Sequence, residues 1–146
     1  YYVYKELVYL VKHLGVEKQV SIVNDYLSSN DIQSLLSQQD VIIYPYQSSN
    51  ESSSASVRDG LSTLKPVLVT PLSIFDDVFD LVDYLPGLSP MDLANGILSW
   101  HAKYTNDPKR CKKLNESRAK IINSLRFSKL SLRLDSIIKS LEINQY

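Results

Sequence analysis

The sequence predicts an α/β domain whose sheet is mainly parallel. Helical and β-branched patterns alternate along residues 2–85, and 146 residues with 44% hydrophobic side chains are enough for one domain with a core. Strands that are separated by a helical pattern are typical of crossover units, in which the strands run parallel. The β-branched runs predict strands near residues 20–23, 40–45, 66–70 and 81–85.

The N-terminal part predicts two helices, one on each side of the first strand. Residues 2–14 carry an apolar stripe at helical spacing, and Gly15 follows where a helix C-cap is expected. Ser28 and Asp31 resemble a capping box with Asp in place of Glu, which predicts a second helix through Gln38.

The central part predicts a strand, a polar loop, a helix and a second strand. Asp40–Tyr44 is a β-branched run that Pro45 stops, residues 52–64 fit a helix, and residues 66–70 fit a buried strand. A short helix at residues 73–78 is expected to follow. Ligands bind beyond the carboxyl ends of parallel strands, so the loop after the first strand and the next helix start form the candidate site.

The C-terminal part predicts helices with clear start signals. Ser89-Pro90 and Asp107-Pro108 each combine a capping side chain with a proline in the first turn, and Ser128 is expected to cap a last helix. The final helices are expected to cover about residues 108–141. The side chains of the last helix expected to face the core are Leu130, Leu134, Ile137, Ile138 and Leu141.

Composition indicates the compartment and argues against a metal site. The longest apolar runs are too short to cross a bilayer, and the N-terminus has no signal-peptide pattern. The lone Cys111 excludes an internal disulfide framework and fits a reducing compartment, where we interpret it as a packed hydrophobe. His13 and His101 are far apart in the sequence. We therefore expect a cytoplasmic protein in which Cys111 has no redox or metal role.

Charge is distributed unevenly although the net charge is zero. Residues 1–100 hold 5 Lys or Arg and 12 Asp or Glu, whereas residues 101–146 hold 11 and 4. Such asymmetry indicates either a peripheral contact with an anionic membrane or simply the solvated faces of helices. Aromatic residues do not interleave with the basic ones, so we expect no nucleic-acid partner.

The segment from residue 44 to residue 67 combines two acids with small residues at defined spacing. It contains, in order, Tyr44-Pro45, Glu51, Asp59, Gly60 and Lys65-Pro66-Val67. This order resembles the donor-binding signature of retaining glycosyltransferases with the GT-B fold, family 4 type, and the resemblance extends from about Leu7 to Trp100. Two features depart from the family: Asp59 stands for Glu, and Ser52-Ser53-Ser54 stands for Gly-aromatic-Gly.

The resemblance implies that residues 1–146 form a single nucleotide-sugar-binding domain. Its fold would be a Rossmann-like three-layer domain that forms the C-terminal half of a GT-B enzyme. Such an enzyme would transfer a hexose in polysaccharide or glycolipid synthesis of the bacterial type, without a metal or other cofactor. In the family a strand and a basic loop come first, and the chain has no matching basic motif before residue 100. We therefore expect a fragment that lacks the first strand and the N-terminal acceptor domain, and that transfers no sugar by itself.

The candidate site residues are Glu51, Ser52, Ser53, Ser54, Ser56, Asp59 and Tyr26. Free backbone N–H groups at the serine-rich helix start suit a phosphate. Glu51 is the catalytic candidate because its carboxylate can accept hydrogen bonds from hexose hydroxyls, and Asp59 is expected to bind ribose hydroxyls. Tyr26 lies where the family places the nucleobase.

Each of these interpretations has an alternative. Glu51 would instead stabilise a helix start through the helix dipole, and the serines would be helix caps. Tyr26 would be a half-buried loop aromatic. Arg58 is expected to be a surface residue. If residues 51–59 are helical, the two acids are separated by about 12 Å along the axis, more than the roughly 5–9.5 Å of glycosidase pairs. The alternative function is a non-catalytic Rossmann-like regulatory or ligand-binding module.

Overall fold

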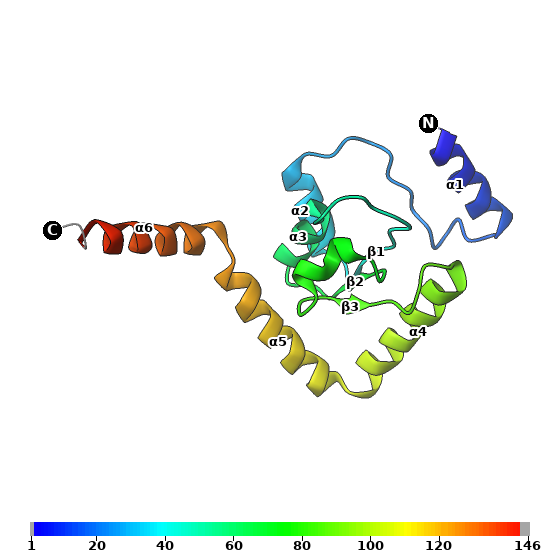
Figure 1. Cartoon of the computed structure of the whole chain (residues 1–146). Coiled ribbons are helices and arrows are strands. Elements are labelled where there is room, and N and C mark those ends of the chain that lie inside the picture. Colours follow the sequence, from blue (N-terminus) through cyan, green and yellow to red (C-terminus); the bar gives the residue numbers. More distant parts are fainter. Residues whose placement is uncertain (1, 144–146) are drawn as a thin grey trace. The chain divides into compact units, whose positions relative to one another are not determined.

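The computed structural model describes residues 2–143, and Figure 1 shows their helices and strands. The chain divides into two compact parts, one that ends at Ile32 and one that starts at Gln33. The prediction that residues 1–146 form one domain stays a prediction.

The first part begins with helix α1 (Tyr2–His13), as expected. Gly15 has φ +66°, the left-handed conformation that ends many helices, and its N–H donates to the carbonyl of Lys12 at 3.1 Å. The hydroxyl of Ser28 accepts from the N–H of Asp31 at 3.3 Å, so the predicted cap of α2 (Ser29–Ser37) is confirmed.

The predicted strand at residues 20–23 is wrong. These residues have no strand assignment, and the N–H of Val20 donates to the carbonyl of Val16 at 3.1 Å in a turn. Val20 and Val23 are also exposed, at 43% and 56% of their surface. A short apolar run alone does not specify a strand, because a strand also requires a partner for its backbone groups.

The second part contains a three-stranded parallel sheet flanked by helices, in the order β1-β2-β3. The strands are β1 (Ile42–Tyr44), β2 (Val67–Val69) and β3 (Asp83–Tyr84). Tyr44 pairs with Val69, and Val69 pairs with Tyr84. The predicted parallel pairing of the central strands is therefore confirmed, although each strand is shorter than expected. All three residues of β2 are buried, as is typical of an inner strand of a parallel sheet.

The core lies between the sheet and the two helical segments that follow β1 and β2. These are α3 (Ala55–Ser62) and the short 3-10 helix η1 (Ser73–Val78). The core contains Ile42, Val57, Leu61, Val67, Val69, Ile74, Phe75, Val78, Leu81 and Val82. It therefore joins β1 and β2 to α3 and η1.

The C-terminal helices start largely where the capping signals predict. They are α4 (Pro90–Asn106), α5 (Pro108–Ser124) and α6 (Phe127–Ile143). Ser89 and Asp92 form a complete capping box before α4, and Asp107 caps α5. Ser128, however, lies inside α6, because the carbonyl of Arg126 already accepts from the N–H of Leu130 at 3.0 Å.

The prediction that α6 turns its apolar side chains toward the core is also wrong. Leu130, Leu134, Ile137, Ile138 and Leu141 are between 43% and 62% exposed. Figure 1 shows α6 extending from the end of α5. None of the helices within residues 2–143 is long and apolar enough to cross a membrane.

Candidate functional site

The candidate site lies at the carboxyl edge of the sheet, where the loops after β1 and β2 emerge together. Because the strands are parallel and Tyr44 pairs with Val69, both loops leave the same edge. The hydroxyl of Thr70 donates to the carbonyl of Tyr46 at 2.7 Å, which connects the two loops. The side-chain amide of Gln47 donates to the carbonyl of Leu88 at 3.2 Å, just before α4. The edge is therefore a connected set of loops.

Helix α3 begins three residues later than the sequence predicts. Ser54 has extended dihedral angles (φ −102°, ψ 121°), and its hydroxyl accepts from the N–H of Val57 at 3.2 Å. Ser54 is buried, and its hydroxyl also lies 3.4 Å from that of Tyr46. Its position is thus explained by capping, whereas Ser52 and Ser53 are exposed loop residues before the cap.

The later start of α3 changes the expected separation of Glu51 and Asp59. The estimate of about 12 Å assumed that residues 51–59 form a continuous helix, and this assumption is wrong. Only the residues from Ala55 to Asp59 are helical, which corresponds to a rise of about 6 Å. The separation of Glu51 and Asp59 is therefore set by the loop, and helical spacing no longer argues against a glycosidase pair.

Glu51 lies in the loop, with its backbone held and its carboxylate accessible. The N–H of Glu51 donates to the hydroxyl of Ser49 at 3.1 Å. Its side chain is exposed, and within residues 2–143 the carboxylate has no hydrogen bond or ion pair. Glu51 thus presents an acceptor to solvent beside the start of α3.

Asp59 lies one turn into α3, on its exposed side. Its carbonyl accepts from the side-chain amide of Gln33 at 3.3 Å and from the hydroxyl of Ser62 at 2.7 Å. The hydroxyl of Ser62 also donates to the Oε1 of Gln33 at 2.9 Å, so Gln33 braces this end of α3. These contacts use the backbone of Asp59 and leave its exposed carboxylate accessible.

Tyr44 connects the end of β1 to α3. Its hydroxyl donates to the carbonyl of Ser56 at 2.6 Å. Burial raises the pKa of Tyr44 to about 12, and the nearby carboxylate of Asp59 adds to the shift. A Cβ at Gly60 would lie 2.7 Å from the Tyr44 hydroxyl oxygen, so Gly60 is explained by this close packing. Ser56 itself is exposed at the start of α3.

Arg58 has a larger role than the expected surface residue. Its Nη1 donates to the carbonyl of Ser54 at 2.7 Å, and its Nη2 forms an ion pair with the carboxylate of Asp77 in η1. The guanidinium thus connects the start of α3 to η1 and places a positive charge beside the candidate edge. The sequence offers the spacing of four residues between Ser54 and Arg58, but it gives no signal for Asp77.

Tyr26 belongs to the first part of the chain and is 99% exposed. This exposure does not fit a half-buried loop aromatic. A role for Tyr26 at a nucleobase stays a prediction.

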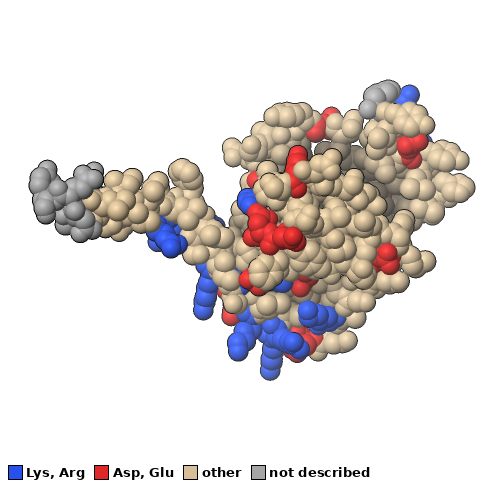
Figure 2. All heavy atoms as spheres, viewed as in Figure 1, with Lys and Arg blue, Asp and Glu red and all other residues tan. Residues whose placement is uncertain are grey.

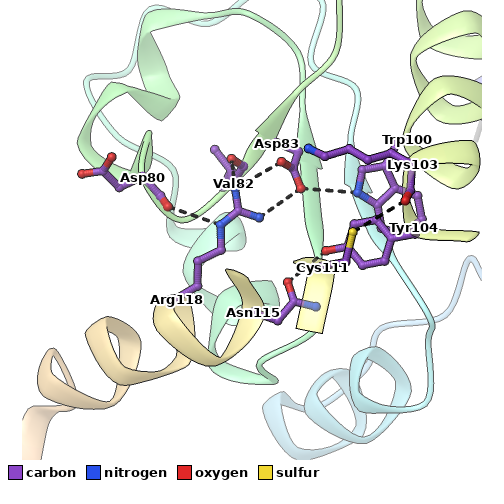
Figure 3. Close-up of polar contacts among 9 residues, drawn as sticks. All are labelled: Asp80, Val82, Asp83, Trp100, Lys103, Tyr104, Cys111, Asn115 and Arg118. Carbon is purple, nitrogen blue, oxygen red and sulfur yellow. Dashed lines mark hydrogen bonds and ion pairs between the residues drawn. The ribbon is translucent and has the colours of Figure 1, made fainter. Parts of the chain in front are cut away.

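A second polar cluster lies between β3, α4 and α5, and it is structural (Figure 3). Arg118 donates to both carboxylate oxygens of Asp83, at 3.0 and 3.2 Å, and to the carbonyl of Val82 at 2.7 Å. The indole N–H of Trp100 donates to Asp83 at 3.3 Å. The charged groups are therefore used to hold α4 and α5 against β3.

The described part of the chain has four hollows whose linings include neither Glu51 nor Asp59. The largest has a volume of about 440 Å³ and is lined by residues of α4 and α5, including Tyr104 and Cys111. Another, of about 350 Å³, lies beside β3 and α4. Within residues 2–143, moreover, no group of three or more His, Cys, Asp or Glu could hold a metal ion.

Comparison with known proteins adds no family to this description. The sequence matches no model of a known protein family, and it matches no curated protein.

Proposed function

We propose that this chain is the donor-binding domain of a retaining glycosyltransferase of the GT-B type. One observation carries the proposal: the segment that resembles the family signature folds as strand, loop, helix and strand, with β1 parallel to β2. This topology brings the loop with Glu51 and the start of α3 to the carboxyl edge, where ligands bind in such sheets. The activated sugar would therefore bind across this loop and helix start.

The start of α3 supplies the phosphate site in this proposal. The N–H groups of Ala55 and Ser56, in the first turn, have no acceptor within the helix, and the helix dipole favours an anion there. Ser52, Ser53 and Ser56 are exposed and add hydroxyl donors. Ser54 acts indirectly, because its hydroxyl caps α3 and so fixes the direction of the free N–H groups.

The two acids bind the sugars at either end of the diphosphate. Glu51 accepts hydrogen bonds from the hexose hydroxyls, next to the bond that breaks, and is the proposed catalytic residue. Asp59 binds the ribose hydroxyls, either directly or through a water because its side chain is short. The resemblance alone assigns Tyr26, which belongs to the first part of the chain, to the nucleobase.

The finer fold belongs to the same proposal. The three-stranded sheet is the centre of a Rossmann-like three-layer domain, and the resemblance places the acceptor in an N-terminal domain of the same protein. The reaction uses neither a metal nor another cofactor. The proposed location is the cytoplasm, where nucleotide sugars serve as donors for polysaccharide and glycolipid synthesis.

Saturation-transfer NMR on the 146-residue chain with several uridine and guanosine diphosphate sugars tests the proposal. We expect signal transfer to ribose and hexose protons of at least one of them, and weaker transfer for Glu51→Gln and Asp59→Asn. Asp40→Asn is the matched control, because Asp40 is an exposed acid that precedes β1 at the opposite edge of the sheet. If the transferred signal is the same for every sugar and is not weakened by Glu51→Gln or Asp59→Asn, a non-catalytic ligand-binding module would be favoured.

A further inference from the structure

Helix α6 carries a continuous apolar stripe on its surface. Six apolar side chains recur at spacings of three and four residues, which places them on one face of the helix. They are Phe127, Leu130, Leu134, Ile137, Ile138 and Leu141. Each is between 43% and 87% exposed, so the whole stripe faces water.

Basic side chains border this stripe on one side. Helical spacing puts Arg126, Lys129 and Arg133 along one flank, whereas the exposed Leu132 lies on another face. Among the described side chains of α6, one ion pair is present, between Asp135 and Lys139 at 2.7 Å, and both of these residues lie off the stripe. The basic flank of α6 is therefore not neutralised by carboxylates of the same helix among the described side chains.

The preceding helix continues the positive charge. Exposed basic residues of α5 include Lys109, Lys112, Lys113 and Lys120, with Glu116 as the exposed acid among them. Figure 2 shows Lys and Arg side chains gathered along α5 and the start of α6. The excess of basic residues in the C-terminal part of the sequence thus lies on α5 and on the start of α6, the helix that carries the apolar stripe.

We propose that α6 lies in the surface of an anionic lipid bilayer. An apolar stripe bordered by Lys and Arg is typical of helices that lie in the plane of a membrane interface. The stripe would enter the boundary of the acyl chains, while Arg126, Lys129 and Arg133 meet lipid phosphates. With 17 residues, several of them charged, α6 does not span the bilayer.

The charges that border the apolar stripe favour contact of α6 with an anionic lipid surface over pairing of α6 with a second copy of the chain. In a helix pair, the positions that border the stripe would meet those of the partner helix. If Phe127, Leu130, Leu134, Ile137 and Leu141 form the centre of the contact, these positions hold Arg126, Ser131, Arg133, Ser140 and the stripe residue Ile138, and none of them is acidic. A second copy would therefore leave Arg133 without an opposite charge, whereas an anionic lipid supplies one.

Flotation of the 146-residue chain with vesicles tests the proposal. We expect the chain to float with vesicles of phosphatidylcholine and phosphatidylserine at 0.1 M salt, and much less with phosphatidylcholine alone. Binding should fall at 1 M salt, because the Debye length shortens from about 10 Å to about 3 Å. Equal binding to both kinds of vesicle at low salt would overturn the proposal.

Substitutions in α6 separate the apolar and the basic contributions. Leu134→Gln with Ile138→Gln should weaken binding by more than about tenfold, because two buried apolar side chains are lost. Leu132→Gln is the matched control on the other face and should bind like the parent chain. Arg133→Gln should weaken binding by about fivefold, and by more than Lys139→Gln.

Two outcomes would overturn the assignment of α6. One is that the paired Leu134 and Ile138 substitutions bind vesicles as the parent chain does. The other is that the parent chain binds no vesicles but is a dimer that these substitutions convert to a monomer, which would make the stripe a contact between two copies. Every described side chain of α6 is exposed, so these changes leave the folded core intact, and circular dichroism checks this.

Discussion

Replacing Arg118 with methionine should destabilise the second part of the chain by removing the link between α5 and β3. In the structure the Nη1 of Arg118 is 3.0 Å from Asp83, and its Nη2 is 2.7 Å from the carbonyl of Val82. The side chains of Arg118 and Asp83 are only 11% and 19% exposed. Methionine keeps an unbranched side chain at this position but leaves the carboxylate without its cation.

The size of the effect lies between two limits. Breaking a buried ion pair costs about 3–5 kcal/mol, whereas an exposed pair contributes about 0–1 kcal/mol. Asp83 keeps some contact with water, and the indole N–H of Trp100 still donates to it at 3.3 Å. We therefore expect the free energy of unfolding to fall by about 2–3 kcal/mol, or the Tm by about 4–12 °C.

Urea unfolding followed by the fluorescence of Trp100, the single tryptophan, measures this loss. Arg110→Met is the matched control, because Arg110 is an exposed residue of the same helix. We expect that substitution to change the free energy of unfolding by about 0.5 kcal/mol or less. If Arg118→Met and Arg110→Met unfold at the same urea concentration, the structural role of the cluster is refuted.

Three further predictions concern α3 and the strand that it packs on. Gly60→Ala should lower the free energy of unfolding by about 1–3 kcal/mol, since overpacking and a disturbed Tyr44 hydrogen bond outweigh the helix propensity of alanine. Combining it with Tyr44→Phe should recover part of this loss in urea titrations, and full additivity would contradict the packing. Ser54→Ala should cost about 1 kcal/mol through the lost cap, whereas Ser53→Ala should change thermal unfolding little; equal losses would refute the capping role. Tyr44 should titrate near pH 12, measured as the difference in absorbance between the parent chain and Tyr44→Phe. Because its pKa is raised in the folded state, the stability linked to this shift is present below pH 10 and is lost as the pH rises toward 12. Titration of Tyr44 near pH 10 would be inconsistent with its burial.

Local signals predicted most of the helix starts in this chain. Ser89 and Asp107 cap α4 and α5 through their own side chains, and Gly15 follows α1 with a positive φ. These features depend on residues within a few positions of each other, so the sequence contains the complete interaction. The parallel sheet was also predictable, because the helical segment 55–62 separates its first two strands.

Features that depend on distant residues were not predictable. The run at residues 20–23 has the apolar character of a strand, yet nothing in that run shows whether a partner strand is available. Ser52 is a residue type that is common at helix starts, but the side chain of Ser54 provides the cap of α3. The ion pairs of Arg58 with Asp77 and of Arg118 with Asp83 join residues 19 and 35 positions apart.

The candidate site was predictable only in its location. Glu51 lies in the loop after β1 and Asp59 lies on α3, and both acids are exposed, whereas their binding roles stay predictions. The direction of Ser54 into the core, however, comes from Val57 and Tyr46, which the motif does not describe. The cap thus decides that the hydroxyl of Ser54 is buried while Ser52 and Ser53 are exposed.

The affinity of the chain for a nucleotide sugar, measured by titration calorimetry, tests the central claim most directly. With the donor that gives the strongest NMR signal, Asp59→Asn should raise the Kd by about 5- to 150-fold, which corresponds to about 1–3 kcal/mol for a lost hydrogen bond to a charged group. Asp40→Asn, at the opposite edge of the sheet, should leave the Kd unchanged. Equal affinity of the parent chain and Asp59→Asn, or no heat with any nucleotide sugar, would contradict the account.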